Sequence, residues 1–171
     1  MKLYPGYNKI WLTDPIYDPI YRLAEKYDKP VAVHMGLTAY SQAYLKYSHP
    51  LALDEAAADF PRTRFVMCHF GNPFLEAAAA VLEKNPNVCA DLSGLLEGRA
   101  DWTLLCGAGR IRGAAAHLDG LSGLLGPLPV RHRLAHRQSG GVHRYIQRIV
   151  PERYWEPVFY DNANRIYRLG L

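Results

Sequence analysis

The stretches PVAVHMG (residues 30–36) and RFVMCHFG (residues 64–71) decide the fold of this chain. Each is a short apolar run bounded by proline or glycine, and such runs are typical of strands buried on both faces of a parallel sheet. The two runs end in His34 and His69. Active sites of α/β proteins are assembled at the C-terminal ends of parallel strands, because the loops there vary while the strands fix the side chains. We therefore predict that both imidazoles lie at the functional edge of one sheet.

Strand-like and helix-like segments alternate over the first hundred residues. Residues 1–7 and 88–92 are predicted as further strands, and residues 53–59 and 74–83 as helices. When single helices join the strands, right-handed crossovers make the sheet parallel. The pattern therefore predicts an α/β fold, either a TIM-like barrel or a doubly wound sheet.

A first helix is predicted to begin at Asp14, which is a good N-cap, with Pro15 at the first helical position. Residues at helical spacing form an apolar stripe that we expect to face the core. They are Ile16, Ile20, Leu23, Ala24 and Tyr27.

Length and composition favour one ordinary globular domain. The chain has 171 residues, of which 49% are hydrophobic, and no apolar run is long enough for a membrane span. The N-terminus lacks a signal-peptide pattern, so we expect a cytoplasmic protein without a membrane partner. Cys68, Cys89 and Cys106 lack CxxC spacing and predict neither a disulfide nor a thiolate metal site.

The positive charge is concentrated in one segment. The net charge is +4, and residues 103–144 contain six arginines against Asp119 as their single acid. This segment has no aromatic residue and no helical or strand period, whereas nucleic-acid surfaces usually combine ordered arginines with aromatic rings. We therefore expect no nucleic-acid partner, and we interpret residues 103–143 as an aberrant, poorly ordered segment.

Several motifs in order resemble one family. MKLYPGY, PVAVHMG, ALDEAAADFPRTRFVMCHFGNP, NVCADLSG and the closing FYDNANRIYRLGL are similar to motifs of the amidohydrolase-related (amidohydrolase 2) family of metal-dependent hydrolases and decarboxylases. Members of that family are (β/α)8 barrels. The resemblance implies a partial TIM-like barrel, about strands 4 to 8, as a single truncated domain over residues 1–171.

The resemblance also implies the site. The histidine that ends the fifth strand of such barrels binds the metal, which assigns His34 as a metal ligand. The histidine that ends the sixth strand is a second ligand in binuclear members or handles the attacking water in mononuclear ones, which assigns His69 as catalytic. Neighbouring strands lie about 4.8 Å apart, so two imidazoles at one level could address one ion. The expected cofactor is a divalent metal ion, with zinc as first choice.

Other residues receive weaker assignments. His49 is predicted as a turn residue, Asp91 as a cap or loop hydrogen-bond acceptor, and Lys2 as solvated surface rather than part of the barrel mouth. The four histidines of the segment 103–144 receive no role, and no substrate-binding residue is assigned. They are His117, His132, His136 and His143.

Two metal-binding motifs of the family are absent from the sequence: the HxH pair of the first strand and the Gly-Ser/Thr-Asp-Trp-Pro motif that ends the eighth. If the codons for residues 130–143 are read one nucleotide later, their degenerate positions permit Phe-Gly-Thr-Asp-Trp-Pro. We hypothesise that residues 103–143 are translated out of frame. Sequencing the gene is expected to show this motif in the shifted frame, and a stop codon there would contradict the hypothesis.

The predicted function is metal-dependent attack of water on a carbonyl-type carbon of a small-molecule substrate. A metal-dependent decarboxylase of the same superfamily is the main alternative. Two others remain: an inactive fragment, and an open α/β binding module without metal. Five strands cannot close an eight-stranded barrel, and unpaired edges favour aggregation or pairing with another chain, so we also consider a homo-oligomer.

Overall fold

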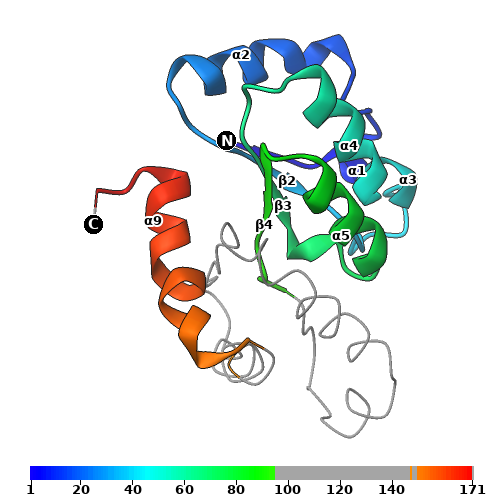
Figure 1. Ribbon diagram of the computed structural model, residues 1–171. Helices are drawn as coiled ribbons and strands as arrows, with labels where there is room; N and C mark the ends of the chain where they lie inside the picture. Colours follow the sequence, from blue (N-terminus) through cyan, green and yellow to red (C-terminus); the bar gives the residue numbers. More distant parts are fainter. Residues whose placement is uncertain (95–146, 148–149, 171) are drawn as a thin grey trace, which may run out of the picture.

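The part of the chain that the structure describes folds around a four-stranded parallel sheet (Figure 1). The computed structural model describes residues 1–94, 147 and 150–170. The predicted aberrant segment, residues 103–143, lies outside these described residues, as do Cys106 and the four histidines without a role. The strands follow the order β1-β2-β3-β4 and are β1 (Lys2–Leu3), β2 (Val31–His34), β3 (Phe65–Cys68) and β4 (Val88–Ala90).

Helices occupy most of the remaining described chain. The N-terminal ones are α1 (Pro5–Asn8), η1 (Pro15–Tyr17), α2 (Asp18–Lys26), α3 (Leu45–Ser48), α4 (Pro50–Asp59), η2 (His69–Gly71) and α5 (Leu75–Lys84). The C-terminal ones are η3 (Glu152–Tyr154), η4 (Pro157–Asp161) and α9 (Asn162–Tyr167).

The crossover helices α2, α4 and α5 lie together on one side of the sheet, and α9 lies on the other side (Figure 1). The strands also pair in chain order. A doubly wound sheet places crossover helices on both faces and reverses its strand order, whereas a barrel places them all outside. The described part of the chain therefore has the architecture of a partial TIM-like barrel.

Both faces of the sheet are covered by apolar groups. On the helix side, a large core joins strand residues to α2, α4 and α5. On the other face, Ile166 of α9 is buried in a smaller cluster. Its strand members are Ala32, Val66, Cys68 and Cys89. Coverage of both faces explains why the β2 and β3 sequences are continuously apolar rather than alternating.

The first strand is shorter than predicted. Only Lys2–Leu3 pair with β2, because Pro5 begins the helical turn α1. Helix α4 in turn begins at Pro50, three residues before the predicted start, because His49 is its N-cap and its Nδ1 accepts a hydrogen bond from the Leu51 N–H at 3.3 Å. The turn role predicted for His49 thus corresponds to a helix cap.

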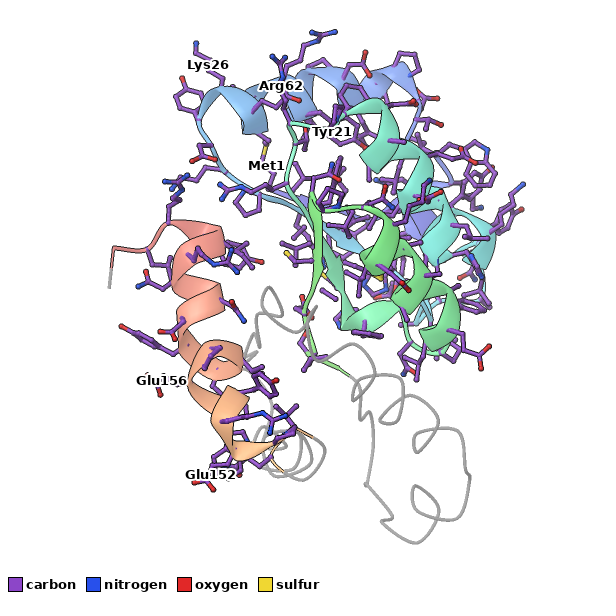
Figure 2. All side chains as sticks on the ribbon, viewed as in Figure 1. Met1, Tyr21, Lys26, Arg62, Glu152 and Glu156 are labelled. Atoms are coloured by element: carbon purple, nitrogen blue, oxygen red, sulfur yellow. The ribbon has the colours of Figure 1, made fainter. Side chains whose placement is uncertain are left out.

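The first helix starts as predicted but turns a different face inward. Asp14 accepts a hydrogen bond from the Ile16 N–H. Most of the predicted stripe is nevertheless exposed, and the buried residues are Tyr17, Tyr21 and Ala24. Tyr21 can be buried because its hydroxyl donates to the Leu12 carbonyl at 2.7 Å, which satisfies its polar end. Figure 2 shows Tyr21 on the inner side of α2, while Lys26 and Arg62 point outward.

Both cysteines of the described chain are buried, unpaired thiols, as the sequence predicts. Burial raises the pKa of Cys68 and of Cys89 to about 12, so both stay protonated near neutral pH. No helix among the described residues has the length and apolar character needed to cross a bilayer.

Candidate active site

His34 and His69 meet at the C-terminal edge of the sheet. The β2–β3 register pairs His34 with Cys68, so His69 follows directly after the paired residue. The His69 Nε2 atom lies 3.2 Å from the His34 Nδ1 atom. The ring centroids are 4.9 Å apart and the ring planes are inclined at 68°. The structure therefore brings together the two histidines singled out in the sequence, 35 residues apart.

Backbone carbonyls define which ring nitrogens carry protons. The Leu37 carbonyl lies 3.1 Å from His34 Nε2, and the Ser93 carbonyl lies 2.7 Å from His69 Nδ1. Because a carbonyl oxygen only accepts, these contacts assign protons to His34 Nε2 and His69 Nδ1. The lone pairs of His34 Nδ1 and His69 Nε2 then face each other. Two facing lone pairs repel, and a proton or a cation between them makes the arrangement favourable.

This donor pair fits a divalent metal ion. Zinc binds imidazole nitrogen at about 2.0–2.1 Å, which puts two nitrogens of a tetrahedral site about 3.3 Å apart. The observed separation of 3.2 Å is close to that value. Imidazole ligands usually donate their second N–H to a carbonyl or carboxylate, as both rings do here. Within the described residues, no group of three or more His, Cys, Asp or Glu could hold a metal, so this part of the chain supplies two donors.

Two tyrosines flank the His34 ring. The Tyr4 ring stacks on it at a centroid distance of 5.7 Å, and Tyr7 meets it edge-on at 5.2 Å. The Tyr7 hydroxyl also accepts a hydrogen bond from the Ala39 N–H at 2.8 Å. Neither tyrosine was predicted from the sequence. The sequence did hold a signal for Tyr4, which directly precedes Pro5 and so ends the first strand, and the register then places it at the level of His34.

The prediction for Lys2 is wrong, and the prediction for Asp91 is confirmed. Lys2 was expected at the solvated surface, but its ammonium group contacts the Cys68 thiol. The reason is register: Lys2 pairs with Ala32, whose side chain shares a sheet face with Cys68. Asp91 acts as the predicted loop acceptor, because its Oδ1 atom accepts from the His69 N–H at 3.0 Å and the Ser93 N–H at 3.1 Å.

Comparison with known families decides the membership of this chain. The model of the amidohydrolase family matches residues 1–120, which include His34, His69 and the four strands of the described sheet. The chain belongs to the amidohydrolase family. Amidohydrolases are generally metal-dependent, which agrees with the facing imidazole lone pairs. No protein of curated function matches this amidohydrolase chain.

Solved structures confirm the barrel fold. An uncharacterised TIM-barrel protein from Bordetella bronchiseptica matches with a TM-score of 0.70 and 19% identity, over 96% of this chain and 56% of its own. Dihydroorotase from Campylobacter jejuni matches with a TM-score of 0.63 and 17% identity, over 98% and 58%. 4-Oxalomesaconate hydratase from Rhodopseudomonas palustris matches with a TM-score of 0.54 and 17% identity, over 98% and 54%. This amidohydrolase chain therefore spans a little over half the length of these structures.

Proposed function

We propose that the protein of this chain is a metal-dependent hydrolase in which water attacks a carbonyl-type carbon, such as that of an amide, ester or lactone, in a small molecule. The observation that carries the proposal is the 3.2 Å approach of two ring nitrogens, His34 Nδ1 and His69 Nε2. Family membership supports metal-dependent chemistry in general. The preference of neutral imidazole for zinc-like ions supports a divalent metal, with zinc as first choice.

In the proposed site, His34 would hold the ion through Nδ1, with its Nε2–H on the Leu37 carbonyl. A bound divalent ion would polarise the substrate oxygen and lower the pKa of bound water to about 7. Imidazole is suited to proton transfer near neutral pH. His69 donates from Nδ1 to the Ser93 carbonyl, so its Nε2 remains an acceptor for the proton of the attacking water.

Zinc binding to the full chain tests the proposed site. Titration calorimetry is expected to show that His34→Ala weakens zinc affinity by about 100-fold or more, because it removes a ligand rather than an outer partner. His69→Ala is expected to weaken it less, since this ring is assigned to the water proton; an equal loss would make His69 a second ligand instead, which the 3.2 Å separation also allows. His49→Ala is the matched control, because this histidine caps α4 through Nδ1 and is expected to leave affinity unchanged.

Wild-type affinity in His34→Ala would contradict the site. The reaction class is tested separately with the zinc-loaded full chain and a panel of amides, esters, lactones and carboxylates in ¹⁸O-labelled water. Hydrolysis places ¹⁸O in the product. Release of carbon dioxide from a carboxylate without ¹⁸O uptake would replace the proposal by the decarboxylase alternative.

A further inference from the structure

The turn after β3 contains two residues in a rare backbone conformation. His69 has φ +62° and Phe70 has φ +49°, and both lie in the left-handed region that non-glycine residues seldom occupy. An extended continuation would point His69 to the face of Met67, because side chains alternate along a strand. That face packs against the crossover helices. The left-handed turn instead carries the His69 imidazole to His34.

One residue of the neighbouring strand end holds this turn. Asp91 is buried, and its Oδ1 atom accepts from the His69 N–H at 3.0 Å. Its own carbonyl accepts from the Phe70 N–H at 2.9 Å, and its N–H donates to the Met67 carbonyl at 2.9 Å. Asp91 therefore binds both left-handed residues and the strand residue that leads into them. These bonds offset the cost of the strained turn.

The same carboxylate also orients the His69 ring through the next two residues. Asp91 Oδ1 accepts from the Ser93 N–H at 3.1 Å and from the Ser93 hydroxyl. This holds the Ser93 carbonyl 2.7 Å from His69 Nδ1. Gly94 lies beside the same nitrogen with φ +67°, and a Cβ there would be 2.8 Å from Nδ1. Only glycine leaves the ring room in its observed position.

We propose that Asp91 and Gly94 are positioning residues that hold His69 in the Nδ1–H tautomer with Nε2 directed at His34. The inference deepens the proposed function and rests on the catalytic role given there to His69. Asp91 acts through the His69 backbone and the Ser93 carbonyl, and Gly94 acts by leaving space. Asp91 and Gly94 both follow β4, the strand that pairs with β3, so the site extends over the ends of β2, β3 and β4.

Nitrogen-15 NMR of the His69 ring in the metal-free full chain tests this inference, because the two neutral tautomers have different ¹⁵N shifts. Asp91→Ala is expected to lower the ratio of Nδ1–H to Nε2–H tautomer at least about tenfold, since the Ser93 carbonyl is released. Asp91→Asn keeps an acceptor oxygen for both N–H groups and is expected to restore the wild-type ratio. Gly94→Ala is expected to lower the ratio while the Asp91 bonds remain.

Asp54→Ala is the matched control. Asp54 accepts hydrogen bonds from Lys84 and Asn85 away from the site, so its loss is expected to reduce stability and leave the His69 tautomer unchanged. A wild-type tautomer ratio in both Asp91→Ala and Gly94→Ala would overturn the inference. If Asp91→Ala does not fold, Gly94→Ala alone decides in the same way. The readout needs no metal, so failure of zinc binding in the wild type would overturn the proposed function and leave this test intact.

Discussion

Replacing Gly36 with alanine is expected to destabilise the protein by about 3–5 kcal/mol, because a steric overlap with backbone adds to an unfavourable backbone angle. A Cβ at this position would lie 2.1 Å from the Asn72 carbonyl oxygen and 2.7 Å from the Gly71 carbonyl carbon. Gly36 also has φ +86°, which L side chains rarely adopt. Urea unfolding followed by circular dichroism measures the change.

The crowding at Gly36 reflects how the site is assembled. The Gly36 N–H donates to the Ser48 carbonyl and the Leu37 N–H donates to the Asn72 carbonyl, both at 2.7 Å. The second of these bonds joins the loop after His34 to the loop after His69, and the first joins it to the end of α3. Separating these loops is expected to move the two imidazoles apart, so Gly36→Ala is also expected to weaken zinc binding.

Gly170→Ala is the control for the unfavourable backbone angle without the steric overlap. Gly170 has φ +74°, but a Cβ there would meet nothing within 4 Å. The expected loss is about 1 kcal/mol, the usual cost of a side chain in this conformation. Equal losses at the two glycines would contradict the close packing of the two loops.

Leu53→Ala is expected to cost about 3–4 kcal/mol, because it leaves a cavity in the core between α4 and the sheet. Leu53 is fully buried in the cluster that joins the helices to β2 and β3. The same cluster supports the strands that carry His34 and His69. Chemical denaturation gives the free energy of unfolding, and the slope of the transition reports whether the native state stays compact.

Leu51 provides the comparison within the same helix. It lies two residues earlier on α4 and is 55% exposed. Leu51→Ala is expected to change stability by less than about 0.5 kcal/mol, as for most surface substitutions. A large loss for Leu51→Ala, or a small one for Leu53→Ala, would show that α4 packs through another face.

Local patterns were sufficient to predict the elements that carry the site. The runs that end in His34 and His69 form β2 and β3 because an apolar segment bounded by proline or glycine has few other ways to be buried. The cap at Asp14 was predictable because it is also local: the Asp14 side chain accepts a hydrogen bond from an N–H two residues away. Lys2 was misplaced, because its face depends on pairing with Ala32, thirty residues later in the chain.

The inner face of α2 also required the tertiary structure. The predicted apolar stripe of η1 and α2 favoured Ile16 and Leu23, but burial of Tyr21 depends on the Leu12 carbonyl, which accepts from its hydroxyl, and on ring packing with Phe65. Hydrophobic periodicity weighs side chains one at a time. It does not include the hydrogen bond that a carbonyl elsewhere in the chain accepts from a buried tyrosine hydroxyl.

The sequence by itself determined the two strands that carry the site, their parallel direction and the histidines at their ends, because these follow from short-range patterns and from the geometry of crossovers. The alternation of strands and helices left open whether the sheet was a barrel or doubly wound, and the family resemblance favoured the barrel. The tertiary structure decided that by placing α2, α4 and α5 on one face. It also decided which nitrogens face each other, because the His69 turn is held by Asp91 from another strand end, and no local pattern specifies such a contact.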